Sequence, residues 1–177
     1  MLGTSAGAVK SVLHRARVTL TEPGPNDSGA ASRLSVGMGV EPIVQRYLDA
    51  FNARDADAVA ALLHEDAVTT IVGSAEELGR EVTRGASLAE WAADPNDQWA
   101  MAGRFDGRHV LFVFFRTAEH DRALAWMIEL EIGDGGIHRQ RQYYFCPELT
   151  AYAAASLGVP AVSHGHRYVL PAASGER

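Results

Sequence analysis

The alternation of apolar and polar residues divides the chain into an N-terminal helix, a linker and a longer body. Within residues 1–22, apolar side chains recur at helical spacing between positions 4 and 20. Residues 23–40 hold two prolines and four glycines among small polar residues, which is typical of a flexible linker. The body extends over residues 41–158, and we expect an irregular tail at 159–177.

Local signals predict the helices of the body. The apolar positions of residues 41–53 fall on one face of a helix. Asp55 is suited to cap a second helix, and Ser87 with Glu90 forms a capping box that opens a short third one. A last helix over 147–157 begins with a proline and ends before a glycine, two residues that favour these helix ends.

Period-two alternation and turn residues predict the strands of the body. They cover residues 67–72, 98–105, 108–116, 122–132 and 137–145. Asp106-Gly107 is a strong hairpin signal, because both central residues of that turn need positive φ. In the strand at 122–132 one face is expected to carry Leu124, Trp126, Ile128, Leu130 and Ile132. The predicted fold class is α+β: a curved antiparallel sheet packed on helices, with a cavity between them, preceded by one isolated helix.

Composition and charge restrict the class of protein. Of the 177 residues, 47% are hydrophobic and 21% are charged, which is the composition of a folded domain. The single cysteine, Cys146, excludes an internal disulfide and a zinc site built on cysteine pairs. Residues 1–22 carry a net charge of +2, whereas the whole chain carries −6, so a basic segment precedes an acidic body. No segment predicts a membrane helix or a signal peptide, and we expect a cytoplasmic protein without membrane contact.

Three segments of the body resemble SnoaL-like domains of the nuclear-transport-factor-two-like (NTF2-like) superfamily. VQRYLDAFNARDADAVAALLHEDAV at residues 44–68 resembles the helix pair that opens those domains. GREVTRG at 79–85 and GGIHRQRQYYFCPEL at 135–149 resemble the middle loop and the last strand. This resemblance covers about residues 41–150 and implies a cone-shaped sheet around a pocket.

The N-terminal segment has a different resemblance. LGTSAGAVKSVLHRARVTL at residues 2–20 is similar to the last helix of the sigma-four DNA-binding domain of extracytoplasmic-function sigma factors. Some groups of these sigma factors carry a SnoaL-like domain after a short linker, and this chain has the same order of parts. The earlier helices of that domain and the promoter −10-binding domain have no counterpart here. We therefore expect that the helix is poorly ordered or docked elsewhere and that this chain alone does not start transcription. Two alternatives stay open for Met1, which is either the true start or an internal methionine of a longer frame.

The resemblance to a recognition helix implies DNA-contacting residues in a full-length protein. Donors and charges that would meet base edges and phosphates are Lys10, Ser11, His14 and Arg15. The implied partners are promoter DNA and the RNA polymerase core. The alternative is a solvated basic helix face with no ligand.

The strand at 137–145 supplies a candidate pocket wall, because its polar side chains alternate onto one face. The candidate pocket residues are Trp91, Arg116, His138, Gln140 and Tyr144. The alternative is an open sheet face in water or a contact with another domain.

Catalytic machinery is not evident in the sequence. Enzymes of the resembled superfamily, such as ketosteroid isomerases and polyketide cyclases, use a pocket carboxylate for proton transfer. Residues 137–145 contain no aspartate or glutamate, and Cys146 stands where related sequences often have aspartate. Glu129 and Glu131 alternate with apolar residues and are interpreted as solvated. His164 and His166 have metal-like spacing without a third ligand, so we assign no catalytic residue, metal or cofactor.

The combined interpretation is the C-terminal part of an extracytoplasmic-function sigma factor, whose SnoaL-like domain regulates transcription initiation in cis. A small ligand in the cone is a candidate effector. Two alternatives stay open. One is a freestanding SnoaL-like binder or isomerase/cyclase-type enzyme with a pocket carboxylate, and the other is a module that forms homodimers through its sheet.

Overall fold

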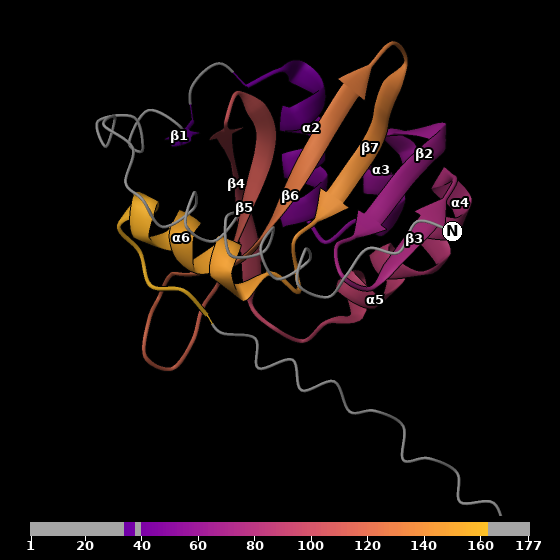
Figure 1. Ribbon diagram of the computed structural model, residues 1–177. Coiled ribbons are helices and arrows are strands. Elements are labelled where there is room, and N and C mark those ends of the chain that lie inside the picture. The colour runs from indigo at the N-terminus through magenta and orange to yellow at the C-terminus, as the bar shows by residue number, and fades with distance from the viewer. Residues whose placement is uncertain (1–33, 38–39, 163–177) are drawn as a thin grey trace, which may run out of the picture. The chain divides into compact units, whose positions relative to one another are not determined.

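The computed structural model describes residues 34–37 and 40–162, which form the body of the protein (Figure 1). Residues 1–32 make up a separate unit that lies outside the described residues, and the predictions for Lys10, Ser11, His14 and Arg15 lie there with it. His164 and His166 also lie outside the described residues.

Seven strands form a single curved sheet in the order β1-β4-β5-β6-β7-β2-β3. The strands are β1 (Leu34–Val36), β2 (Leu63–Ile71), β3 (Ala75–Leu78), β4 (Gln98–Phe105), β5 (Arg108–Phe115), β6 (Ala123–Gly133) and β7 (Gly136–Gln142). Neighbours pair antiparallel except β2 and β7, which pair parallel. The sheet is therefore mixed, and the expected antiparallel arrangement is corrected at this one pair. A parallel pair needs a long crossover, and the chain between β2 and β7 supplies it.

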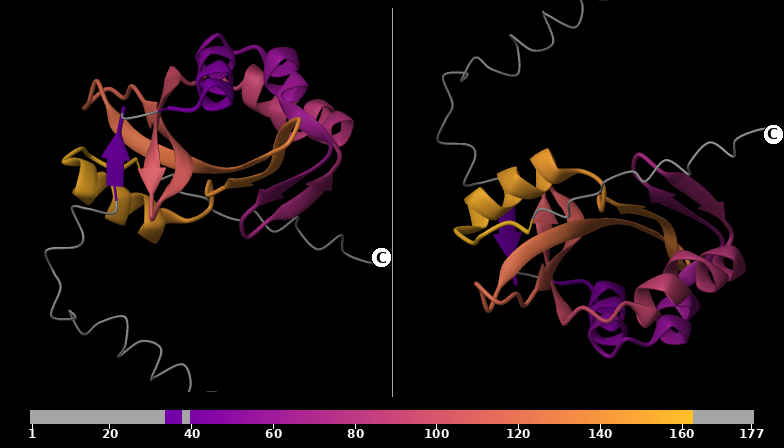
Figure 2. Two further views of the ribbon diagram at one scale, coloured as in Figure 1. Left: turned by 90° about the horizontal axis from the view of Figure 1, so that it is seen from above. Right: turned by 90° about the horizontal axis from the view of Figure 1, so that it is seen from below.

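The helices cover both faces of the sheet. They are α2 (Pro42–Asn52), α3 (Ala56–Ala61), α4 (Arg80–Gly85), α5 (Ser87–Ala93) and α6 (Pro147–Leu157). The sheet curves around α2–α5, and α6 lies on its opposite side against β6 (Figure 2). We call the surface toward α2–α5 the inner face and the surface toward α6 the outer face. The predicted α+β class, with helices packed on a curved sheet, is confirmed.

Several helix ends follow the sequence signals. Asp55 accepts a 2.8 Å hydrogen bond from the backbone N–H of Ala58, so it caps α3 as predicted. Helix α6 begins at Pro147 and ends at Leu157, before Gly158, whose φ of 66° is left-handed. The hairpin between β4 and β5 also has the predicted turn, because Asp106 and Gly107 both have positive φ.

Strand β5 separates two apolar layers. Leu111, Val113 and Phe115 belong to the inner cluster, and Phe112 and Phe114 belong to the outer one. All five side chains are buried, and the helices of the same chain cover both faces. Both faces of this strand are therefore covered within the body.

A bulge in β6 changes the face on which its first residues lie. Val113 pairs with Trp126 and Phe114 pairs with Leu124, so Ala125 is an extra residue in β6. As a result Leu124 packs in the outer cluster and Trp126 in the inner cluster. The prediction that both share one face was wrong at Leu124, because one inserted residue reverses the alternation.

The ends of the body differ from the predicted boundaries. Residues 34–36, assigned to the linker, form the edge strand β1 and pair with β4. Gly103 allows this approach, because a Cβ at that position would collide with the carbonyl oxygen of Ser35. At the other end, the backbone N–H of Leu124 donates to the carbonyl oxygen of Pro160, and the carbonyl oxygen of Leu124 accepts from the N–H of Val162. The tail therefore begins with a short extension of the sheet.

Candidate functional site

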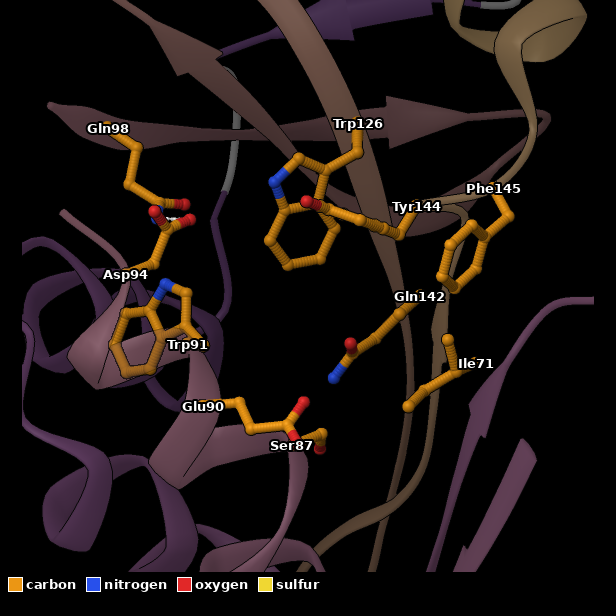
Figure 3. A pocket seen from close by; sticks show the side chains of 10 residues that line it. All are labelled: Ile71, Ser87, Glu90, Trp91, Asp94, Gln98, Trp126, Gln142, Tyr144 and Phe145. Carbon is orange, nitrogen blue, oxygen red and sulfur yellow. Dashed lines mark hydrogen bonds between the residues drawn. The ribbon is translucent and has the colours of Figure 1, made fainter. Parts of the chain in front are cut away.

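A cavity of about 280 Å³ lies between the inner face of the sheet and helix α5. It is lined by Ile71, Ser87, Glu90, Trp91, Asp94, Gln98, Trp126, Gln142, Tyr144 and Phe145 (Figure 3). Helix α5, the loop after it and the start of β4 supply one wall, and β2, β6, β7 and the residues after β7 supply the other. The volume is near the lower end of the range for small-molecule sites, about 300 Å³, which suits a molecule of one or two rings.

The start of α5 is fixed by a buried carboxylate from β3. Both oxygens of Glu77 accept hydrogen bonds from Ser87, one from its backbone N–H at 3.1 Å and one from its hydroxyl at 2.7 Å. Ser87 is consequently the first residue of the helix and not its cap, and the predicted capping box with Glu90 is absent. Glu90 is thereby left to line the cavity.

Arg54 holds the other end of α5 and the loop that follows. Its guanidinium donates to the backbone oxygens of Trp91, Asp94 and Asn96. The same group lies 5.4 Å from the centre of the Trp91 ring, within cation–π range. Because one guanidinium binds three carbonyl oxygens, it fixes the backbone of Trp91 and Asp94, whose side chains line the cavity.

The Asp94 carboxylate is held by its neighbours. One oxygen accepts from the backbone N–H of Asn96 at 2.9 Å and from its side-chain amide at 2.7 Å. The other oxygen accepts from the side-chain amide of Gln98 at 3.0 Å. This last bond orients Gln98, because its NH₂ faces Asp94 and its carbonyl oxygen must point elsewhere.

Three polar atoms around the cavity lack hydrogen bonds. Within the described part of the chain, the buried side-chain nitrogen and oxygen atoms without a partner are Trp91 Nε1, Trp126 Nε1 and Gln98 Oε1. All three residues line the cavity. Buried polar groups are hydrogen-bonded in most proteins, so each of these three atoms calls for a partner, either a water molecule or a bound ligand.

Aromatic rings form most of the remaining surface. Trp91 stacks on Phe51 of the core with ring centres 4.5 Å apart, and Trp126 meets the ring of Tyr144 edge-on at 5.5 Å. Phe145 packs edge-on against Tyr144 at 5.2 Å. Burial, with a smaller contribution from the negative charge of Asp94, raises the pKa of Tyr144 above its ordinary value. The phenol therefore stays protonated at neutral pH.

The charged side chains that line the cavity are acidic. Glu90 and Asp94 bring carboxylates, and among the described residues that line the cavity none is lysine, arginine or histidine. In Figure 3, Glu90 and Gln142 extend toward each other from opposite walls. An anionic molecule would meet two carboxylates without a compensating cation, so the site disfavours anions.

The five predicted pocket residues do not all line the cavity. Trp91 and Tyr144 line the cavity. Gln140 is fully buried outside the lining and is hydrogen-bonded to Tyr47 and Thr69. His138 stacks on His64 and meets the backbone oxygen of Asp134, next to the turn between β6 and β7 and outside the cavity. Arg116 is exposed and pairs with Asp97 at 2.7 Å, also outside.

Sequence reasoning missed most of the cavity wall. Glu90, Asp94 and Gln98 come from α5, its following loop and the start of β4, which no strand alternation connects to β7. A signal for Gln142 was available, because it follows Gln140 on the polar side of the same strand. Trp126 was placed on the apolar face of the predicted strand at 122–132, and no pattern indicated that it borders a cavity.

A separate ion-pair cluster lies on the outer face. Glu129 is buried and accepts hydrogen bonds from Arg108 at 3.0 Å, Arg141 at 2.7 Å and the Tyr143 hydroxyl at 2.7 Å. The interpretation of Glu129 as a solvated side chain was wrong, whereas Glu131 is exposed as expected. Burial, together with the bond to Glu129, raises the pKa of Tyr143 to about 12.

Metal-binding, membrane-spanning and thiol sites lack support in the described residues. No group of three or more histidine, cysteine, aspartate or glutamate side chains there could hold a metal ion. None of the helices in that part of the chain is long and apolar enough to cross a membrane. Burial raises the pKa of the Cys146 thiol, which lowers its reactivity.

No protein-family model matches the chain, and no curated protein matches its sequence. Solved structures are similar to part of the chain. One is a proposed ketosteroid isomerase from Kribbella flavida, with a TM-score of 0.43, 22% identity, and coverage of 56% of this chain and 73% of that one. Another is a proposed polyketide cyclase from Sinorhizobium meliloti, with a TM-score of 0.43, 23% identity, and coverage of 58% and 94%. A third is an NTF2-like protein of unknown function from Mesorhizobium loti, with a TM-score of 0.43, 19% identity, and coverage of 69% and 95%.

Proposed function

We propose that the body is a small-molecule-binding regulatory domain of an extracytoplasmic-function sigma factor, which modulates transcription initiation in cis. The observation that carries the binding function is the cavity beside α5, with its three unpartnered polar atoms on Trp91, Trp126 and Gln98. Each unmade bond at a buried polar atom costs about 1–3 kcal/mol, so three such atoms beside one cavity favour a site that a bound molecule completes.

The sigma-factor context is supported by the sequence of residues 2–20, which is similar to a promoter-recognition helix. In that context the partners are promoter DNA and the RNA polymerase core, contacted through Lys10, Ser11, His14 and Arg15. The acidic body would interact with basic DNA-binding or core-binding domains of the same protein. Regulation then requires that the ligand bind two states of the protein with different affinity.

Transcript sequencing of strains with altered chromosomal genes tests this proposal at every promoter of the genome at once. The first strain lacks the codons for residues 41–162, and the second carries Trp126→Phe, which keeps an aromatic ring and removes one cavity donor. We expect the same set of transcripts to change in both. Trp99→Phe is the control, because Trp99 stacks on Phe114 in the outer layer, and it should leave transcripts as in the wild type. Unchanged transcripts in the deletion strain would contradict a regulatory role.

An enzyme with a pocket carboxylate is the second candidate, favoured by Glu90 in the cavity wall. Asp94 is less suited to accept a proton, because Asn96 and Gln98 already donate to both of its oxygens. Glu90→Gln separates the two functions. It removes the base but keeps the shape of the side chain, so it would abolish turnover by an enzyme and leave a binding domain with its ligand affinity.

A further inference from the structure

The hydrogen-bonding atoms of the cavity restrict the chemistry of its ligand. Trp91 Nε1 and Trp126 Nε1 are donors without an acceptor, and Gln98 Oε1 is an acceptor without a donor. In Figure 3 both indole nitrogens lie on the side of the cavity where Asp94 and Gln98 meet. The unmet requirement of the site is therefore an acceptor and a donor close together.

The orientation of Gln98 makes this requirement specific. Its side-chain NH₂ donates to Asp94 at 3.0 Å, and a flipped amide would bring two oxygens together in a half-buried place. The carboxylate of Asp94 is itself fixed by Asn96 at 2.9 Å and 2.7 Å. The free atom of Gln98 is thus an oxygen, which calls for an N–H or O–H on the ligand.

Charge and shape narrow the choice further. Carboxylates of Glu90 and Asp94, with no basic side chain in the described lining, oppose an anion. A simple cation such as a quaternary ammonium has no acceptor to offer the two indole N–H groups. The rings of Trp91, Trp126, Tyr144 and Phe145 suit a flat molecule, which stacks on or meets them edge-on.

We infer that the ligand is an uncharged planar ring compound that carries a hydrogen-bond acceptor next to a donor, as a cyclic amide does. Its acceptor meets the indole N–H groups of Trp91 and Trp126, and its donor meets Gln98 Oε1. This inference rests on the proposed binding function and adds the class of ligand to it.

Titration calorimetry of the full chain with three probes tests the ligand class. Quinolin-2(1H)-one has the acceptor and the donor, 1-methylquinolin-2-one lacks the donor, and quinoline-2-carboxylate is an anion of similar size. We expect the first to bind at least about tenfold more tightly than either of the others, because one unmet buried bond is worth roughly a factor of ten.

Two protein variants test whether the probe binds in this cavity. Trp126→Phe should weaken the binding of quinolin-2(1H)-one about tenfold, and Trp99→Phe on the outer face should leave it unchanged. Equal binding of the N-methyl compound, or no binding of any probe, would overturn the inference. Tightest binding of the carboxylate, still weakened by Trp126→Phe, would overturn the ligand class while leaving the cavity as a binding site.

Discussion

The hydroxyl of Tyr47 on α2 donates a 2.7 Å hydrogen bond to the side-chain oxygen of Gln140 on β7. Both side chains are fully buried. The amide of Gln140 then donates to the hydroxyl of Thr69 on β2 at 2.7 Å, and Thr83 on α4 donates to the same oxygen at 2.9 Å. This buried chain of bonds joins two helices to the parallel pair of strands, β2 and β7, which also contribute Ile71 and Gln142 to the cavity lining.

Tyr47→Phe should lower the free energy of unfolding by about 1–3 kcal/mol, because it leaves the Gln140 oxygen buried without a donor. Denaturant unfolding measures the change. Tyr152→Phe, at a side chain that is 41% exposed, is the matched control and should have little effect. If Gln140→Leu is added to Tyr47→Phe, the double variant should lose less than the sum of the two single losses, and strict additivity would argue against the bond.

Arg54→Lys should destabilise the protein and weaken binding in the cavity. An ammonium group cannot reproduce the planar set of donors that reaches the backbone oxygens of Trp91, Asp94 and Asn96. We expect a loss of about 1–2 kcal/mol in unfolding free energy. Arg46→Lys, at an exposed position of α2, serves as the control. Equal behaviour of the two variants would show that Arg54 does not hold the loop.

Gly103→Ala should displace β1 from the sheet. A Cβ at this position would collide with the Ser35 backbone and lie 2.8 Å from the Phe112 ring. We expect faster hydrogen exchange of the β1 amides and a loss of stability, since overpacking costs about 1–3 kcal/mol. Gly85→Ala is the control, because nothing lies within 4 Å of its Cβ position. Unchanged exchange in β1 would mean that the segment pairs less closely with β4 than described.

Tyr143 should make stability depend on alkaline pH. Its pKa is raised from 10 in the unfolded chain to about 12 in the fold, so the folded state holds this proton more tightly. The contribution is complete below about pH 10 and is lost as the pH rises through about 12. Tyr143→Phe should reduce the fall in stability over this interval and leave the pH slope between 7 and 9 unaltered. An unchanged alkaline slope would contradict the raised pKa.

The parts of the fold that depend on neighbouring residues were predictable from the sequence. The cap at Asp55, the turn at Asp106-Gly107 and the end of α6 at Gly158 each depend on backbone preferences within a few positions. Strand β4 occupies the predicted residues for the same reason, because alternation and a strong turn define it locally.

The parts that depend on distant contacts were not predictable. Ser87 has the sequence of a cap, but its N–H and hydroxyl donate to Glu77 of β3, and α5 begins at Ser87 itself. One extra residue, Ala125, turns Leu124 to the outer face, and no periodicity reveals an insertion. The cavity depends on both kinds of event, because α5 forms one wall and Trp126, just beyond the bulge, forms part of the other. Trp91 and Tyr144 were therefore named from sequence, whereas Glu90, Asp94 and Gln98 were not.

Fluorine NMR of the full chain labelled with 5-fluorotryptophan tests the central claim most directly. The three tryptophans report on two places, because Trp91 and Trp126 line the cavity and Trp99 lies in the outer layer. With a library of uncharged ring fragments, we predict that binding shifts the resonances of Trp91 and Trp126 together and leaves that of Trp99 in place. If no fragment moves the two cavity resonances, or if Trp99 shifts equally with them, the cavity is not a ligand site and the proposed function is wrong.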